Sequence, residues 1–209
     1  MIVIVDYGMG NLRSVEKAFE ANGARPKVSS LIKDIEKAEK LVVPGVGAFT
    51  HAMKELKARG LVEPIKEKIQ SGSPYLGVCL GLQLLFSRSE EGERVKGLDL
   101  IPGTVVRFKG KPFDTAQNKL KVPHMGWNTL ETKKSACPIL KRVKKSDYFY
   151  FVHSYHGVPE DKSWVLTRTS YGADFCSAVW KGNIFATQFH PEKSQGPGLR
   201  IIKNFIELK

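Results

Sequence analysis

The sequence contains few cysteines, and none of them lies in a disulfide or metal-binding pattern. Its three cysteines are Cys79, Cys137 and Cys176, an odd number without a C-x-x-C pair. This spacing argues against a disulfide framework and against a zinc site, because both need paired or clustered cysteines. Unpaired cysteines are typical of a reducing compartment, so we expect a cytoplasmic protein that holds no metal.

Long hydrophobic runs are also missing. No stretch approaches the roughly 18 uncharged apolar residues that a membrane-spanning helix needs. The apolar start at residues 1–5 is too short for a signal peptide and runs into Asp6, which favours a first β-strand. The chain has 209 residues and shows no repeat, linker or low-complexity segment. We therefore expect one domain, residues 1–209, that makes no contact with a membrane.

Acidic residues are in the minority: 21 Asp and Glu stand against 33 Lys and Arg, a formal net charge of +12. Residues 133–145 contain six basic side chains and no acid. A basic patch can bind nucleic acid, but no aromatic-interleaved motif or helix-turn-helix pattern accompanies this one. We therefore predict a solvated lysine-rich face and no nucleic-acid partner, with a basic nucleic-acid-binding protein as the alternative.

Apolar strands alternate with helical periodicity in the first part of the chain. Strands are predicted at residues 2–5, 26–29, 41–43 and 75–79, and helices at 12–19, 31–38, 49–59, 61–70 and 80–86. Ser30 is expected to cap the second helix. This alternation predicts an α/β fold with a mostly parallel central sheet and helices on both faces. Ligands of such sheets bind at the carboxyl ends of the strands.

Beyond Phe86 the sequence becomes rich in β-strand patterns. Strands are predicted at residues 104–108, 120–123, 148–152, 164–168 and 175–180, and residues 181–183 should turn a hairpin into residues 184–189. We expect these strands to extend the central sheet and to form a small antiparallel sub-sheet. A closing helix is predicted from the spacing of Leu199, Ile202, Phe205 and Ile206.

Two glycine-rich loops follow predicted strands. Gly8 and Gly10 begin a dinucleotide-binding pattern, but its third glycine would be Arg13, and no acidic residue ends the second strand. We therefore predict no nicotinamide or flavin cofactor. The second loop, Pro44–Gly47, can turn its N–H groups toward a bound carbonyl as one half of an oxyanion hole. An ordinary tight turn is the alternative, and the pattern alone does not decide between them.

Cys79 lies between two glycines at a predicted junction of strand and helix. Gly77-Val-Cys-Leu-Gly81 is a cysteine version of the G-x-S-x-G nucleophile elbow, in which residues without a Cβ let the two arms of the turn pass closely. A cysteine in the first turn of a helix is favoured as the thiolate, and the next N–H, that of Leu80, can stabilise an oxyanion. The glycines favour a nucleophile over a buried structural cysteine.

Among the five histidines, His190 is the best candidate for a general base. It follows an apolar strand, and Pro191 disfavours a helical conformation at this position. In an extended segment, residues i and i+2 point the same way, so Glu192 can orient the imidazole. We therefore predict that Cys79, His190 and Glu192 form a catalytic triad.

These motifs resemble those of class I glutamine amidotransferases. Gly77–Gly81 with Gln83 and the run Phe189-His-Pro-Glu-Lys-Ser194 carry this resemblance. Residues 6–14, 44–49, 122–128 and 150–155 look like the corresponding stretches of glutaminase subunits of imidazole glycerol phosphate synthases. The resemblance extends from residue 2 to about residue 206. A glutaminase that serves another synthase, of the anthranilate or pyridoxal phosphate type, and a γ-glutamyl hydrolase are the alternative enzymes.

The resemblance implies that the chain hydrolyses glutamine to glutamate and ammonia through a thioester on Cys79, without a metal or organic cofactor. It implies an oxyanion hole made by backbone N–H groups of Leu80 and of Val46 or Gly47. It also implies glutamine contacts from Gly47, Gln83, Ser154 and Tyr155.

A partner subunit is implied in the same way. The ammonia would pass, within a heterodimer, to a cyclase subunit with a (β/α)8 barrel that makes imidazole glycerol phosphate and aminoimidazole carboxamide ribotide in histidine biosynthesis. The matching interface positions are Asn11, Trp127, Tyr150 and Lys193, with Trp127 in a loop-like run. We expect the isolated subunit to be nearly inactive, because glycines on both sides of Val46 let this loop change conformation when the partner binds.

Overall fold

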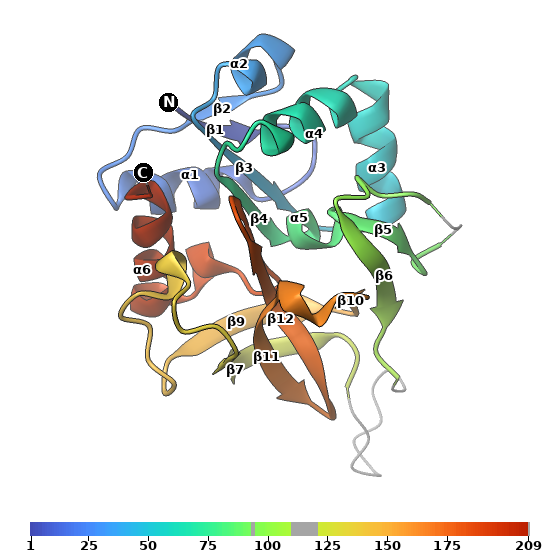
Figure 1. Cartoon of the computed structure of the whole chain (residues 1–209), viewed down its shortest axis with the longest axis vertical. Coiled ribbons are helices and arrows are strands. Elements are labelled where there is room, and N and C mark those ends of the chain that lie inside the picture. Colours follow the sequence, from blue (N-terminus) through green and yellow to red (C-terminus); the bar gives the residue numbers. More distant parts are fainter. Residues whose placement is uncertain (93–94, 110–120, 209) are drawn as a thin grey trace.

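The structure is a computed structural model that describes residues 1–92, 95–109 and 121–208. Its centre is an eight-stranded sheet with the order β2-β1-β3-β4-β13-β12-β11-β8 (Figure 1). The parallel strands are β1 (Ile2–Val5), β2 (Lys27–Ser29), β3 (Lys40–Gly45), β4 (Tyr75–Cys79) and β13 (Ile184–Thr187). The antiparallel extension consists of β12 (Ala173–Lys181), β11 (Val165–Tyr171) and β8 (Glu131–Thr132). The predicted α/β fold with a mostly parallel central sheet is therefore confirmed.

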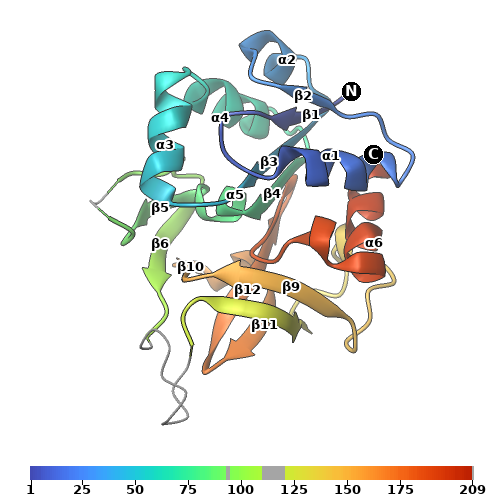
Figure 2. The same ribbon diagram turned by 180° about the vertical axis from the view of Figure 1, so that it is seen from behind.

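Helices cover both faces of this sheet, as Figures 1 and 2 show. They are α1 (Leu12–Glu20), α2 (Ile32–Glu36), α3 (Phe49–Ala58), α4 (Val62–Gln70), α5 (Leu80–Gln83) and α6 (Gln195–Ile206). The alternation of side chains along the strands sets the two faces. Val3 and Val5 of β1 belong to one buried cluster with the apolar residues of α3 and α4. Ile4, between them, belongs to a second cluster with those of α1 and α6.

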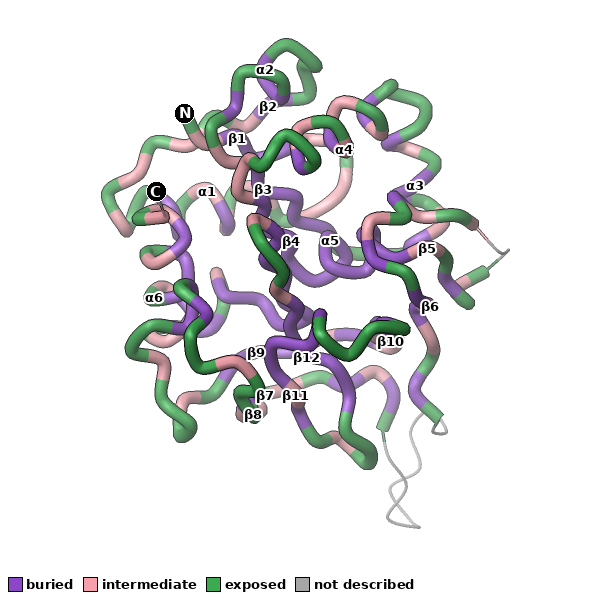
Figure 3. Tube along the Cα trace, viewed as in Figure 1, coloured by how far each residue is buried: buried purple, intermediate pink, exposed green. Residues whose placement is uncertain are grey.

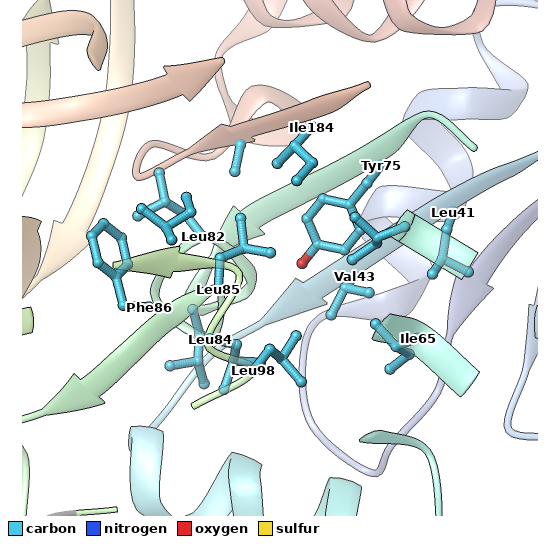
Figure 4. Packing of buried hydrophobic residues seen from close by; sticks show 14 of the residues in the cluster. Leu41, Val43, Ile65, Tyr75, Leu82, Leu84, Leu85, Phe86, Leu98 and Ile184 are labelled. Atoms are coloured by element: carbon cyan, nitrogen blue, oxygen red, sulfur yellow. The ribbon is translucent and has the colours of Figure 1, made fainter. Parts of the chain in front are cut away.

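Buried residues are concentrated around the middle of the sheet (Figure 3). Figure 4 shows the first cluster, in which Leu41, Val43 and Tyr75 of the strands meet Ile65 of α4 and the leucines that follow Cys79. On the other face, the rings of Phe19 and Phe205 meet edge to face at 6.3 Å and join α1 to α6. Strand β4 contributes Tyr75 to the first cluster and Leu76 and Val78 to the second, so it is packed on both faces up to Cys79 at its carboxyl end.

Two small sheets lie beside the central one. One has the order β10 (Tyr155–Pro159), β6 (Ile101–Arg107) and β5 (Phe86–Ser89), and the other pairs β7 (His124–Thr129) with β9 (Tyr148–His153). The single antiparallel sub-sheet expected from the sequence is therefore two sheets. The predicted hairpin is confirmed, because Lys181 of β12 pairs with Ile184 of β13. Three short 3₁₀ turns, η1 (Pro138–Leu140), η2 (Lys162–Trp164) and η3 (Pro191–Lys193), complete the described elements.

Several local predictions are wrong. The helix expected at residues 80–86 has only the four residues of α5, after which the chain turns into β5. The run around Trp127 is not a loop but strand β7. Leu31 rather than Ser30 stands at the N-cap of α2, and its apolar side chain cannot accept a hydrogen bond there. Of the strand predicted at 120–123, Leu120 lies outside the described residues, and residues 121–123 form no strand.

The six basic side chains of residues 133–145 are exposed with one exception, whereas Cys137, Ile139 and Leu140 of the same stretch are buried. Lys134 is half-buried, and its Nζ donates a hydrogen bond to the carbonyl of Trp180 at 2.8 Å and lies 5.5 Å from the centre of that ring. Its ammonium group therefore ties the stretch to β12. Across the part of the chain that the structure describes, no helix combines the length and the apolar character that crossing a membrane requires.

Candidate active site

Cys79 ends strand β4 in a backbone conformation that a side chain rarely adopts. Its φ is +55° and its ψ is −105°, at the sharp turn into α5. A Cβ on Gly77 would lie 2.6 Å from the carbonyl oxygen of Gly81, and a Cβ on Gly81 would lie 1.8 Å from that of Val43. The arms of the turn therefore pass in backbone contact. Non-glycine residues held at such angles cluster at functional sites, which favours the nucleophile elbow.

The helix that follows Cys79 is too short to stabilise a thiolate. The sequence predicted a full helix after Cys79, whose dipole would favour the thiolate. Since α5 has only four residues, its aligned peptide dipoles contribute little to the stability of a negative charge. Stabilisation of a thiolate must come from neighbouring side chains instead.

His190 and Glu192 form a buried pair. Nδ1 of His190 lies 2.7 Å from Oε1 of Glu192, and these side chains are 2% and 3% exposed. The segment is not extended as predicted: only His190 is extended, and η3 begins at Pro191. The contact is therefore made across a 3₁₀ turn.

The surroundings of His190 favour its charged form. Burial lowers its pKa, but the neighbouring thiolate of Cys79 and the carboxylate of Glu192 outweigh burial and raise the pKa above its usual value. The other ring nitrogen, Nε2, is buried and has no hydrogen-bond partner among the residues that the structure describes. Cys79, His190 and Glu192 are therefore brought together in an arrangement that can transfer a proton at Nε2.

A cavity of about 310 Å³ opens at the sulfur of Cys79. Its lining includes the residues predicted for the oxyanion hole and for glutamine: Val46, Gly47, Leu80, Gln83, Ser154 and Tyr155. Two of them follow β3, two lie in α5, one connects β9 to β10, and Tyr155 is the first residue of β10. The structure thus gathers these predicted residues around one space, at the carboxyl ends of parallel strands.

Sequence reasoning missed part of the lining. Glu91, Pro123, Val152 and His153 also face the cavity. Glu91 adds an acidic side chain, and its Oε2 accepts a hydrogen bond from the N–H of Phe49 at 2.7 Å, which fixes it at the start of α3. No motif surrounds Glu91 in the sequence, so only the tertiary fold reveals it.

The loop Pro44–Gly47 lies between Tyr7 and the cavity. The hydroxyl of Tyr7 donates to the carbonyl of Pro44 at 2.9 Å, and a Cβ on Gly45 would lie 2.2 Å from that hydroxyl oxygen. Gly45 is also paired with Cys79 in the sheet. Gly47 has a φ of +97°, a region that glycine adopts without strain. The first half of the loop is held firmly, and the second half keeps glycine's freedom beside the cavity.

Three of the four predicted interface residues lie together. The ring of Trp127, which is 47% exposed, meets that of Tyr150 at 5.9 Å, and Nζ of Lys193 lies 6.0 Å from the centre of the Tyr150 ring. The N–H of His190 donates to the carbonyl of Tyr150 at 2.9 Å, so this cluster adjoins the triad. Asn11 instead caps α1, where its side chain accepts a hydrogen bond from the N–H of Ser14 at 3.3 Å.

The remaining cysteines are structural. Cys137 and Cys176 are free and buried, and burial raises the pKa of each thiol to about 12. They therefore stay protonated and unreactive at neutral pH. In residues 1–92, 95–109 and 121–208, no group of three or more His, Cys, Asp or Glu side chains is arranged to hold a metal ion.

Comparison with known proteins decides the family. The sequence model of the class-I glutamine amidotransferases matches residues 3–208. The chain belongs to this family. It is 55% identical over 208 residues to the imidazole glycerol phosphate synthase subunit HisH of Syntrophotalea carbinolica, with full coverage of both chains. It is 50% identical to the HisH subunit of Geobacter sulfurreducens, over 100% of this chain and 99% of that protein.

Solved structures with lower sequence identity share the fold. A crystal structure of a glutamine amidotransferase matches with a TM-score of 0.72 at 22% identity, over 99% of this chain and 98% of that one. The structure of PurLQS from Thermotoga maritima matches with a TM-score of 0.72 at 18% identity, over 98% of this chain and 96% of that one. Family membership confirms the prediction of a glutamine amidotransferase enzyme that the motifs around Cys79 and His190 made.

Proposed function

We propose that this chain is the glutaminase subunit of an imidazole glycerol phosphate synthase. It acts as one domain, residues 1–209, in the cytoplasm, as half of a heterodimer with a cyclase subunit. The observation that carries the proposal is the buried His190–Glu192 pair beside Cys79, which itself lines a cavity together with the predicted glutamine-binding residues. The identity of 55% to a HisH subunit over the full length supports the choice of synthase.

In the first step, the thiolate of Cys79 attacks the side-chain amide carbon of glutamine. The carbonyl oxygen becomes an oxyanion, which the N–H of Leu80 and one N–H from Val46 or Gly47 stabilise. The C–N bond then breaks, and Nε2 of His190 gives its proton to the departing ammonia. A γ-glutamyl thioester and a neutral imidazole remain. The raised pKa of His190 suits this role, because it enters the reaction protonated.

In the second step, water attacks the thioester. His190, now neutral, takes a proton from the water, and the same N–H groups hold the second oxyanion. The C–S bond breaks, glutamate leaves, and the thiolate–imidazolium pair is restored. Glu192 stabilises the charged imidazole in both steps through its hydrogen bond to Nδ1.

The cavity supplies groups for the amino-acid end of glutamine. Gln83 uses its Nε2 inside the protein, on the carbonyl of Tyr155 at 3.1 Å and on Gln188 at 3.0 Å, so its Oε1 is what it offers to a ligand. Glu91 adds a carboxylate. Both are hydrogen-bond acceptors, and they suit the α-ammonium group of the substrate.

The exposed aromatic cluster of Trp127 and Tyr150 with Lys193 is the proposed docking site for the cyclase. Its rings are large and rigid, a composition enriched at interfaces. It adjoins His190, so ammonia formed at the triad is released close to the subunit interface. The cyclase, with a (β/α)8 barrel, would use this ammonia in a lyase reaction that yields imidazole glycerol phosphate and aminoimidazole carboxamide ribotide.

A reactive analogue tests the nucleophile directly. A chloroketone in which the glutamine side-chain amide is replaced should alkylate Cys79 once, as seen by peptide mass spectrometry. Glutamine should protect the site, and Cys79→Ala should remain unlabelled. Because Cys137 and Cys176 stay protonated, labelling at either of them in preference to Cys79 would contradict the assignment.

A further inference from the structure

A chain of buried hydrogen bonds ends on the sulfur of Cys79, and the triad does not account for it. Nε2 of Gln188 lies 3.6 Å from Sγ of Cys79, and Gln188 is fully buried. Its main chain is anchored as well, since its N–H donates to the carbonyl of Ser177 at 2.8 Å. Either the NH₂ group or the oxygen of the Gln188 amide can face the sulfur, and the neighbouring hydrogen bonds decide which one does.

The carbonyl of Tyr155 fixes the orientation of both amide groups, because a carbonyl oxygen can only accept hydrogen bonds. Gln83 approaches it at 3.1 Å, so Gln83 must point its NH₂ group there. The same NH₂ group lies 3.0 Å from the amide of Gln188, which must therefore present Oε1 to it. Gln188 then turns its own NH₂ toward Cys79. A flipped Gln188 would set two NH₂ groups against each other.

The carbonyl of Tyr155 also contacts His153, which in turn contacts His124. Nδ1 of His153 lies 2.8 Å from the oxygen of Tyr155, so this nitrogen carries a proton. Burial lowers the pKa of His153 to about 3 and that of His124 to about 4, so both rings are neutral. Nε2 of His153 must then accept from Nδ1 of His124, at 3.1 Å. The donor and the acceptor of each hydrogen bond in this series, from His124 to Cys79, are therefore fixed.

The first residue of this series of hydrogen bonds, His124, lies on strand β7, which also contains Trp127. His124 and Trp127 lie on opposite faces of this two-stranded sheet, His124 buried and Trp127 exposed. His124 is packed between the rings of Tyr171 and Phe151, stacked at 3.9 and 4.8 Å. Aromatic packing therefore holds His124 of β7 in place, and hydrogen bonds through His153 connect it to the carbonyl of Tyr155.

We propose that Gln188 is a further catalytic residue, whose NH₂ group donates to the Cys79 thiolate, and that His124 and His153 are positioning residues that hold this donor in place through Tyr155 and Gln83. Hydrogen bonds to a charged acceptor are the stronger kind, and a buried thiolate needs donors that do not reorganise. The short α5 helix gives little of this help. The inference rests on the proposed function, since it requires Cys79 to act as the thiolate.

The test measures the rate at which iodoacetamide alkylates Cys79 as a function of pH, together with glutaminase kinetics in the presence of the cyclase. Gln188→Glu keeps the shape and the acceptor but exchanges the donor for a negative charge, and Gln188→Leu removes both the donor and the acceptor without adding a charge. We expect each to slow alkylation at neutral pH by about tenfold or more, to move its pH profile upward, and to lower kcat with little change in KM. Gln70→Glu, at an exposed position at the end of α4, is the matched control and should behave as wild type.

The positioning residues are tested by rescue. His124→Phe fills the aromatic stack but cannot donate to His153, and we expect it to slow alkylation. His124→Asn restores a donor near the place of Nδ1 and should recover most of the rate. If the Gln188 variants do not fold, the alkylation rates of the two His124 variants still test whether the series of hydrogen bonds acts on Cys79.

Wild-type alkylation rates and pH profiles in the Gln188 variants, with a fully active wild-type enzyme, would overturn this inference alone. A wild-type enzyme that forms no glutamate with the cyclase, and whose Cys79 reacts no faster than a free thiol, would overturn the proposed function and this inference with it.

Discussion

Replacement of Gly81 by alanine tests the packing of the nucleophile elbow. The added Cβ would lie 1.8 Å from the carbonyl oxygen of Val43 and 3.0 Å from its carbonyl carbon. Both neighbours are backbone atoms of β3 in the centre of the sheet, so no side chain can move aside. The turn itself must shift by about 1 Å, and a displacement of that size at a reacting atom costs about 10²-fold in rate.

The stability cost follows from the same contact. Overpacking a core usually costs about 1–3 kcal/mol, and a clash between backbone segments belongs at the upper end. A loss of about 3 kcal/mol corresponds to a fall in Tm of about 6–12 °C for a chain of this length. We expect Gly81→Ala to show this fall in thermal unfolding and to lose at least 99% of its glutaminase rate with the cyclase.

Gly196 provides the matched control. It lies in the first turn of α6, and a Cβ at this position would have no atom within 4 Å. Alanine is favoured over glycine in a helix by up to about 1 kcal/mol, so Gly196→Ala should be as stable as wild type or slightly more so. If Gly81→Ala matched this control in both Tm and activity, the close contact between the nucleophile elbow and the backbone of β3 would be wrong.

Three further predictions concern other parts of the molecule. Glu192→Gln keeps the size of the side chain but removes the charge beside His190, and kcat should fall on the order of 10⁴-fold; a wild-type kcat would exclude the triad role. Trp127→Ala should raise the Kd for the cyclase in titration calorimetry by about 30-fold, as expected for loss of an exposed aromatic anchor, and an unchanged Kd would place the interface elsewhere. His124 and His153 are neutral in the fold, with pKa values of about 4 and about 3, whereas both titrate near about 6.5 in the unfolded chain. The unfolded chain therefore binds more protons below about pH 6.5, so urea unfolding should show stability falling from there to about pH 4, by about 3 kcal/mol for His124 alone; constant stability would refute burial of neutral rings.

Much of the fold follows from local patterns in the sequence. The alternation of apolar strands and amphipathic helices predicts the parallel sheet, because each buried element has a distinct period. The pattern fails where long-range packing overrides it. The chain after Cys79 is apolar enough for a longer helix, but at residues 86–89 it pairs with β6 instead. The β7 strand around Trp127 contains Gly126 and polar residues, so only its pairing with β9 shows that it is a strand.

The site divides in the same way. Cys79, His190 and the residues of the glycine loop lie in short motifs that carry their own chemistry, so the sequence is enough to nominate them. Glu91 lies in no such motif, and Gln188 begins the run that contains His190 but has no role that this run indicates. Gln188 reaches the sulfur only because β13 lies next to β4 in the sheet, and Glu91 reaches the cavity only because its loop meets the start of α3. Contacts of this kind depend on the order of strands, which no local pattern encodes.

The most direct test of the account is glutamate release from glutamine by this chain, alone and then with an imidazole-forming cyclase subunit and its nucleotide ligand. A Cys79→Ala variant runs beside both. We predict release of glutamate in the complete mixture, nearly none from the chain alone, and none with Cys79→Ala. Equal release without the cyclase would refute control of the site through the Pro44–Gly47 loop. No release from the wild-type chain in the complete mixture, or undiminished release from Cys79→Ala, would contradict the central claim.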